Sequence, residues 1–320
     1  MRNPTWLVAI SSVALAACAV NPHVDLSDAS ASAVSLQSEV PFFEQSDYQC
    51  GPAALASVLG ASGVPITPAE LVPQVYLPKR EGSLQVELQA AARRAGRIPY
   101  VINSDIRALA SEVVAGRPVL VLQNLGTPHF PIWHYAVVVG VDPVGNRMTL
   151  YSGTNAELEL PAPRFFRTWD WGERWGIITL EPGQLPALPD PQVYSHAVAA
   201  FEAVATPSEA RRAWRAALDR WPENPRAYFA LGNLAYNDGD ITGAIRFYTQ
   251  GLVRDSRDPA ISNNLAVVMG EIGCPRKGEE LVKSSIHQLD EHSPWLPKLQ
   301  ETLAELAAQS GTDSASCNSL

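Results

Sequence analysis

A cysteine at the start of one predicted helix and a histidine at the start of one predicted strand are the residues of this sequence best placed for chemistry. Cys50 lies in the run Gln-Cys-Gly-Pro-Ala-Ala-Leu, where a loop meets an apolar helix. Free N–H groups and a partial positive charge at a helix N-terminus stabilise a thiolate, and the same groups can hold the oxyanion of an acyl intermediate. His134 opens the apolar strand 135–139, whose sheet would fix the imidazole at the mouth of a cleft. The pair predicts nucleophilic catalysis, with Cys50 as nucleophile and His134 as general base and acid.

The segments that must position this pair form a mixed region of helices and strands, residues 39–181. The run Thr67-Pro68-Ala69-Glu70 has the spacing of a capping box with proline at the first helical position, which predicts a helix start. Apolar spacing and terminal glycines predict two further helices. The predicted helices cover 83–95 and 104–115, and the predicted strands cover 119–122, 135–139, 148–151 and 175–179, with a hairpin turn at 143–146. Helices followed by an antiparallel sheet predict an α+β domain.

Beyond a proline-rich linker, residues 182–190, the sequence is helical and repeats. Pro191, Pro225 and Pro259 are spaced by 34 residues. The eighth residue counted from each proline is Val, Gly or Ala, at a point where a close helix crossing favours a small side chain. This pattern resembles the tetratricopeptide repeat, a hairpin of two helices. The resemblance implies an all-α domain of such repeats over residues 191–310, including a capping helix.

Two motifs together give the first domain a specific resemblance. The run Gln-Cys-Gly-Pro at Cys50 and the run His-Tyr-Ala-Val-Val-Val-Gly at His134 resemble those of the bacteriocin-processing, double-glycine peptidase family of papain-like cysteine peptidases. The resemblance covers about residues 40–180. It implies a papain-like fold and the roles for Cys50 and His134 that the residues themselves indicate. It also implies that the side chain of Gln45 donates a hydrogen bond to the oxyanion.

The third catalytic residue of that family is an aspartate that follows the histidine by one hairpin, and this sequence lacks it. The matching segment, residues 150–153, reads Leu-Tyr-Ser-Gly. Ser152 or Asn155 could instead orient the imidazole. A Cys–His pair without a carboxylate can still work, because orientation contributes only part of the rate.

The N-terminus has the features of an export signal. Arg2 is the only charged residue among the first seventeen, and residues 6–15 form an apolar stretch too short to span a bilayer. The following Leu-Ala-Ala-Cys ends at Cys18 and resembles the lipobox of bacterial lipoproteins. The resemblance implies a signal peptide over 1–17 and a lipid anchor on Cys18. The alanine after the cysteine favours the periplasmic side of the outer membrane over the inner membrane. Residues 18–38 are expected to form a flexible tether.

Export would place the remaining cysteines in an oxidising compartment. Cys274 lies in the turn of the third repeat, and Cys317 lies in the polar tail, residues 311–320. The tail is long enough to fold back, which predicts a disulfide between the two; the alternative is two unrelated thiols, one buried and one at a frayed end. Cys50 should stay free, because a disulfide there would block the nucleophile.

Composition limits the remaining possibilities. The chain has 320 residues, of which 46% are hydrophobic, so it can bury the cores of two domains. Its formal charge of -9, without a basic block, argues against nucleic-acid binding. The spacing of His, Cys and acidic residues predicts no metal site, and the sequence carries no phosphate-binding loop that would indicate a cofactor.

Three functions fit these observations. The first is a membrane-anchored cysteine peptidase that hydrolyses a peptide or protein, with the repeats recruiting a protein partner or the substrate. The second is a non-catalytic peptide-binding or scaffold lipoprotein that retains the papain-like cleft. The third is an acyl-transfer or amidase reaction of the same thiol.

Overall fold

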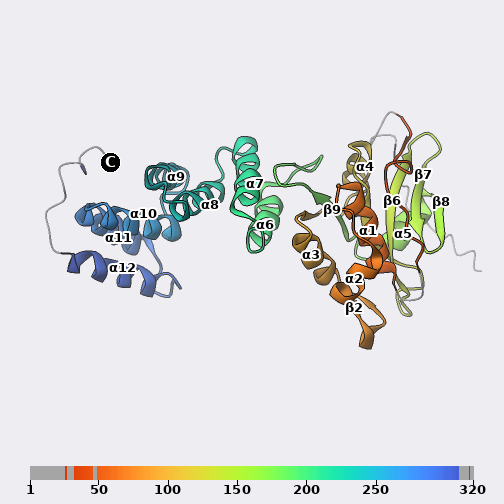
Figure 1. Ribbon diagram of the computed structural model, residues 1–320, viewed down its shortest axis with the longest axis horizontal. Coiled ribbons are helices and arrows are strands. Elements are labelled where there is room, and N and C mark those ends of the chain that lie inside the picture. Colours follow the sequence, from red (N-terminus) through yellow and green to blue (C-terminus); the bar gives the residue numbers. More distant parts are fainter. Residues whose placement is uncertain (1–25, 27–31, 46–48, 310–316, 318–320) are drawn as a thin grey trace, which may run out of the picture.

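The computed structural model describes residues 26, 32–45, 49–309 and 317. A part built from a sheet and helices is followed by an array of helices that extends away from it (Figure 1). The predicted signal peptide, Cys18 with its lipid, and most of the predicted tether lie outside the described residues. Within the described residues, no helix has both the length and the apolar character needed to cross a bilayer.

The described residues form a seven-stranded sheet in which every pairing is antiparallel. Its strands are β1 (Val34–Ser35), β4 (Ile98–Val101), β5 (Val119–Asn124), β6 (Trp133–Asp142), β7 (Arg147–Ser152), β8 (Asn155–Pro161) and β9 (Gly176–Leu180). The order across the sheet is β4-β9-β5-β6-β7-β8, and β1 pairs with β6. The predicted strands and the β6–β7 turn are confirmed. Strands β4 and β8 were not predicted. Strand β4 is short and contains a proline, whereas the alternation of polar and apolar residues in β8 is a usable strand signal that the prediction missed.

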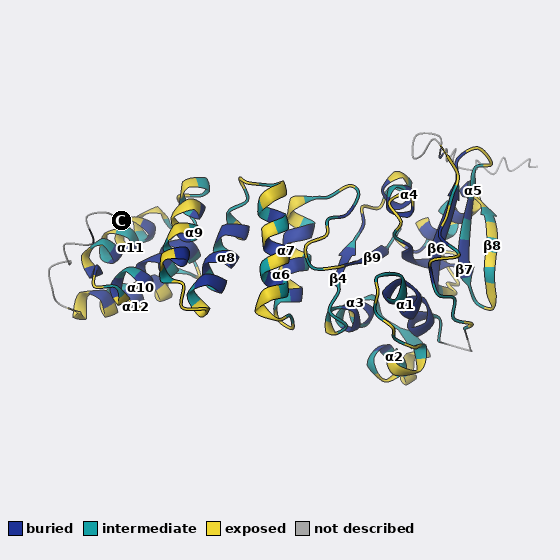
Figure 2. Ribbon diagram, turned by 45° about the horizontal axis from the view of Figure 1, so that its top comes forward, coloured by how far each residue is buried: buried dark blue, intermediate teal, exposed yellow. Residues whose placement is uncertain are grey.

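Five helices of the first part are α1 (Cys50–Ala61), α2 (Pro68–Val75), α3 (Gln85–Arg94), α4 (Ile106–Val114) and α5 (Ala162–Asp170). Helix α1 is mostly buried, whereas β8 exposes alternate residues at the edge of the sheet (Figure 2). The predicted capping box is present, with the backbone N–H of Thr67 donating to Glu70 at 2.9 Å. A small hairpin of β2 (Tyr76–Leu77) and β3 (Gly82–Ser83) follows α2, with the short 3-10 helix η1 (Pro78–Arg80) at its turn. Helix α5 was not predicted.

The structure differs from the predicted tether at its C-terminal end. Strand β1 pairs with β6 through Val34 and Val141. Leu36 is buried in the core, and its backbone N–H donates to Val139 at 2.8 Å. Small polar residues gave this segment a flexible appearance, but β6 extends beyond the end of β5, and β1 pairs with the backbone groups that β5 leaves free there. Residues 34–38 therefore belong to the sheet part.

The repeat region consists of α6 (Pro191–Glu202), α7 (Pro207–Arg220), α8 (Pro225–Asn237), α9 (Ile241–Arg254), α10 (Pro259–Glu271), α11 (Pro275–Gln288) and α12 (Leu296–Ala308). The periodic prolines open α6, α8 and α10, each directly after a capping Asp190, Asn224 or Asp258. The expected small residue is explained at Gly232, where a Cβ atom would lie 2.4 Å from the ring of Tyr248. Helix α12 packs against α10 and α11 as the predicted cap.

The proline-rich linker is held between the two parts. The backbone N–H of Ala187 donates to the buried Glu112 at 2.7 Å, and that of Asp190 donates to the hydroxyl of Tyr100 at 3.1 Å. Helix α6 packs against β4, and buried residues of both parts form one continuous core. The repeats are therefore joined to the sheet part by a packed interface.

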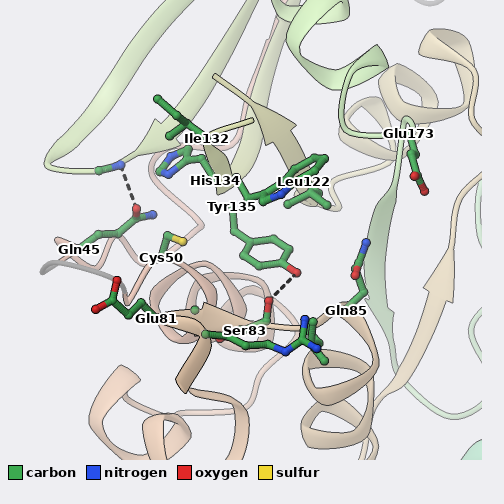
Figure 3. A pocket seen from close by; sticks show the side chains of 15 residues that line it. Gln45, Cys50, Glu81, Ser83, Gln85, Leu122, Ile132, His134, Tyr135 and Glu173 are labelled. Carbon is green, nitrogen blue, oxygen red and sulfur yellow. Dashed lines mark hydrogen bonds between the residues drawn. The ribbon is translucent and has the colours of Figure 1, made fainter. Parts of the chain in front are cut away.

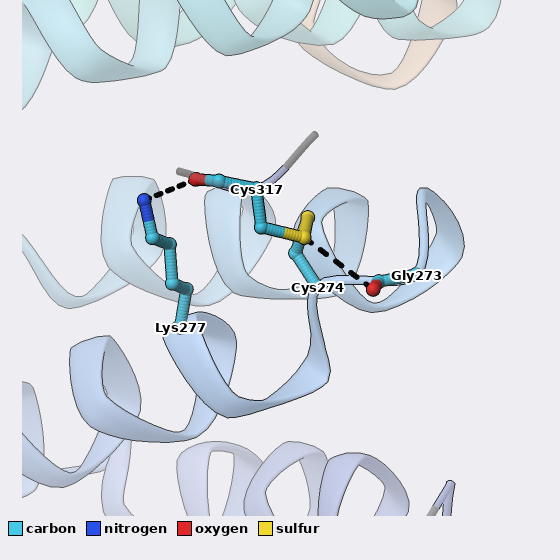
Figure 4. Close-up of a disulfide and its surroundings, with 4 residues drawn as sticks. All are labelled: Gly273, Cys274, Lys277 and Cys317. Carbon is cyan, nitrogen blue, oxygen red and sulfur yellow. Dashed lines mark hydrogen bonds between the residues drawn. A yellow bond between two sulfur atoms is a disulfide. The ribbon is translucent and has the colours of Figure 1, made fainter. Parts of the chain in front are cut away.

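Cys274 and Cys317 form a disulfide, as predicted, with Cα atoms 5.7 Å apart (Figure 4). The backbone carbonyl of Cys317 accepts a hydrogen bond from Lys277 of α11. Cys50 is free. The bridge ties the C-terminal end of the chain to the α10–α11 turn.

Candidate active site

A cavity of about 730 Å³ lies between the helices and the sheet of the first part, and it contains Cys50, His134 and Gln45 (Figure 3). Residues 80–85, from η1 to the start of α3, form one wall. The opposite wall comes from β5 and β6. The structure thus brings together the predicted nucleophile, base and oxyanion donor.

Cys50 is the first residue of α1, so its thiol lies beside the backbone N–H groups of a helix N-terminus. The first N–H groups of a helix have no partner within it, and here the third residue is a proline without an N–H group. Burial raises the pKa of the Cys50 thiol, while the backbone N–H groups of Tyr135, Gly51 and Cys50 itself act to lower it. A Cβ atom at Gly51 would lie 2.5 Å from the hydroxyl oxygen of Ser83, which explains the glycine after the cysteine.

His134 contacts Ser152, the last residue of the neighbouring strand β7. The ring Nε2 lies 2.9 Å from Ser152 Oγ. Asn155, the other residue suggested for this role, is exposed, and its side-chain oxygen accepts a hydrogen bond from the N–H of Glu157 at 2.8 Å. Of the two alternatives, the structure places Ser152 against the imidazole.

Burial governs the protonation of the pair, and the contact with Ser152 bears on the tautomer of the imidazole. Burial lowers the pKa of His134 and raises that of Cys50, so the buried pair favours a neutral imidazole and a neutral thiol. When Nε2–H donates to Ser152, the ring Nδ1 is left unprotonated and can accept the proton of a thiol. The Ser152 hydroxyl can instead donate to an unprotonated Nε2. In that tautomer the ring proton is on Nδ1, which then cannot accept the proton of the thiol.

Gln45 is fixed by two hydrogen bonds to Gly153, which follows Ser152. Its backbone N–H donates to the Gly153 carbonyl at 3.1 Å, and its side-chain Oε1 accepts from the Gly153 N–H at 3.1 Å. This use of Oε1 leaves the amide Nε2 as a donor. Figure 3 shows the Gln45 amide beside the sulfur of Cys50. One turn therefore supports both the imidazole and the amide.

Two residues of the cavity were not predicted from the sequence. Tyr135 reaches across the cavity and donates from its hydroxyl to the carbonyl of Ser83 at 3.2 Å, joining the sheet wall to β3. Burial raises the pKa of Tyr135, so this hydroxyl remains a donor. The hydroxyl of Ser83 is buried and has no hydrogen-bond partner within the described residues. Tyr135 could have been predicted as a residue of the site because it directly follows His134. No local sequence pattern marks Ser83 as a residue of the site.

Two segments of the chain match models of known protein families. Residues 37–167 match the model of the Peptidase_C39 like family, and residues 196–259 match that of the tetratricopeptide repeat. A putative C39-like peptidase from Bacillus anthracis is similar in structure at 18% identity and a TM-score of 0.38, over 47% of this chain and 98% of that one. The type III secretion translocator chaperone SycD of Yersinia enterocolitica is similar at 15% identity and a TM-score of 0.34, over 37% and 83%. A search of the curated proteins finds no match. The chain thus carries a Peptidase_C39-like domain of papain-like α+β fold, followed by an all-α region of tetratricopeptide repeats.

Proposed function

We propose that this protein is a cysteine peptidase that hydrolyses peptide bonds through Cys50 and His134. The observation that carries the proposal is the shared cavity in which Cys50 begins α1, His134 contacts Ser152, and Gln45 is fixed to Gly153. These positions supply a nucleophile, an oriented base and a second oxyanion donor.

The proposed reaction proceeds in two halves. His134 Nδ1 takes the thiol proton as the sulfur bonds to the scissile carbonyl carbon, and the oxyanion is held by the Cys50 N–H and Gln45 Nε2. The carbonyl re-forms as the C–N bond breaks, and His134 passes its proton to the leaving amine, which leaves a thioester on Cys50. Water then attacks the thioester, giving one proton to His134 and releasing the acid. The proton returns to the Cys50 sulfur.

The test uses the full chain without its leader. We expect an electrophilic reagent such as iodoacetamide to label Cys50, and a peptide library to yield cleavage products that disappear in Cys50→Ala. Labelling without any cleavage would favour the scaffold function. The structure offers one observation in favour of that function, since His134 contacts the hydroxyl of Ser152 and not a carboxylate. Products joined to an added amine, in place of free acids, would indicate acyl transfer.

The repeats are proposed to recruit a protein partner or the substrate. A cavity of about 380 Å³ in this region is lined mainly by amide, phenol and aliphatic side chains, among them Asn233, Tyr236 and Asn264. The side-chain oxygen of Asn233 already accepts hydrogen bonds from Tyr248 and Asn264, at 2.7 and 2.9 Å, so we propose that its amide N–H groups donate to an extended peptide. Co-purification of a defined partner with the wild-type chain, but not with Asn233→Ala, would support recruitment.

A lipid anchor at Cys18 in the bacterial cell envelope, on the periplasmic side of the outer membrane, completes the proposal. It rests on the order of charge, apolar stretch, small residues and cysteine in the sequence. Because two or more acyl chains hold a protein firmly at a bilayer, Cys18→Ala should release the protein from the membrane fraction or stall its processing. Unchanged residence in that fraction, with normal leader removal, would contradict the anchor.

A further inference from the structure

The loop between β5 and β6 exposes large apolar side chains beside the candidate active site. Leu125, Phe130 and Ile132 are 48%, 80% and 61% exposed, and Ile132 lines the cavity. We refer to these three residues as the apolar strip. Single exposed apolar residues are common on protein surfaces, but several on one loop at the mouth of a cavity are characteristic of a binding surface.

The loop is held rigidly by Asn124, which is buried. The side-chain oxygen of Asn124 accepts hydrogen bonds from the N–H groups of Gly126 and Ile132, both at 3.0 Å, and its amide donates to the carbonyl of Thr127 at 3.1 Å. A Cβ atom at Gly126 would lie 2.2 Å from the carbonyl oxygen of Phe130, so only glycine fits this close turn. The apolar side chains are therefore presented to solvent by a fixed backbone, which lowers the entropy cost of binding.

Ile132, the residue of the strip that lines the cavity, continues the face of the sheet that carries His134. The backbone N–H of Leu125 donates to the carbonyl of Ile132 at 2.8 Å, which prolongs the pairing of β5 with β6 beyond its last residues. Side chains two residues apart on a strand point to the same face. Ile132 therefore lies on the face of His134, and Figure 3 shows the two side chains next to each other above Cys50.

The opposite wall of the cavity has a different character. Arg80, Glu81 and Gln85 line it together with Leu84, so this wall is mainly polar, whereas the wall beside His134 carries Leu122 and Ile132. A peptide lying between the walls would meet charged and amide groups on one side only. A membrane is the less suitable occupant, because insertion of the strip would cover the mouth of the cavity and because the chain carries a formal charge of -9.

We propose that the apolar strip binds a bulky apolar side chain of the peptide substrate close to the scissile bond, so that the substrates are peptides with such a residue beside the cleavage point. The inference rests on the proposed function, since it assigns specificity to the same site.

The test compares two reagents that react with the same thiol. Peptidyl vinyl sulfones carrying Leu or Phe next to the electrophile probe the strip, whereas iodoacetamide is too small to reach it. The measured quantity is the ratio of the two labelling rate constants at Cys50, which removes any change in intrinsic thiol reactivity. Ile132→Ser and the double variant Phe130→Ser/Ile132→Ser are compared with Val144→Ser, a matched control at an 89% exposed valine in the β6–β7 turn.

We expect the ratio to fall about tenfold in the double variant, a loss consistent with removal of one buried apolar contact, and to stay unchanged in Val144→Ser. The wild type should also prefer the Leu or Phe probe over a matched Asp probe. Two results would overturn the proposed substrate class but not the proposed peptidase function. One is equal labelling rates with the apolar and acidic probes, and the other is an unchanged rate ratio in a double variant that is correctly folded. A Cys50 that reacts with neither reagent would overturn the proposed function and this inference with it. Loss of vesicle binding in the double variant, with its probe ratio unchanged, would assign the strip to a membrane.

Discussion

Replacing Ser152 by aspartate should make Cys50 more reactive near neutral pH. In the structure Ser152 Oγ lies 2.9 Å from Nε2 of His134. A carboxylate at this position can only accept a hydrogen bond, so it would select the tautomer with Nε2–H and leave Nδ1 free for the thiol. It would also stabilise the imidazolium, and through it the thiolate of Cys50. Burial lowers the pKa of His134 and raises that of Cys50, and the added carboxylate would oppose both shifts.

The size of the effect follows from replacing a neutral hydrogen bond by a charged one. A hydrogen bond between neutral groups contributes about 0.5–1.5 kcal/mol, and one to a charged group about 1.5–3 kcal/mol. A gain of about 1–1.4 kcal/mol in favour of the ion pair corresponds to about a five- to tenfold larger thiolate fraction. Ser152→Asn is the matched control, because asparagine has the size of aspartate without its charge.

The assay is the rate of iodoacetamide labelling at Cys50 from about pH 5 to pH 10, followed by mass spectrometry. In the wild type, labelling should rise with pH toward the raised pKa of the thiol. In Ser152→Asp the rise should begin at lower pH, and the rate near pH 7 should exceed that of Ser152→Asn about five- to tenfold. Adding His134→Ala to Ser152→Asp should remove the gain. Equal rates in the Asp and Asn variants would refute the coupling of His134 to Cys50.

Three further predictions concern stability. Gly51→Ala should lower the free energy of unfolding by about 1–3 kcal/mol, because its Cβ atom would lie 2.5 Å from the Ser83 hydroxyl; urea denaturation should show most of this loss restored by adding Ser83→Gly. Cys317→Ser should lower the stability of the repeats by up to about 4 kcal/mol, since the bridge to Cys274 spans 43 residues, and dithiothreitol should then destabilise the wild type but not the variant. Burial raises the pKa of Glu112 in the folded protein above its value in the unfolded chain. The folded protein therefore gains stability from the protonated carboxyl below the unfolded-state pKa. This stability is lost as the pH rises through the folded-state pKa. The variant Glu112→Gln should not show this loss. The prediction is contradicted when the unfolding free energies of the wild type and the variant differ by a constant amount between about pH 4 and pH 7.

The features of this protein that depend on local patterns could be predicted from the amino-acid sequence alone. Cys50 could be placed at a helix start because small residues and a proline precede an apolar run, and this is independent of the rest of the chain. His134 could be placed at a strand end from the continuous apolar run that follows it. The repeats were visible because each copy begins with a proline and has Val, Gly or Ala at the same position of the helix crossing. Local hydrogen bonding and close packing impose these residues wherever the element occurs.

Features that depend on pairing between distant segments could be seen only in the folded protein. Ser152 and Asn155 face each other across the β7–β8 turn, and only the irregular register after Leu150, together with the pairing to β6, directs Ser152 toward His134. The docking of the linker depends on Glu112 and Ala187, which lie 75 residues apart. The polar group beside the imidazole and the way in which the repeats join the sheet part therefore follow from contacts between residues that lie far apart in the chain. Such contacts leave no periodic pattern in the sequence.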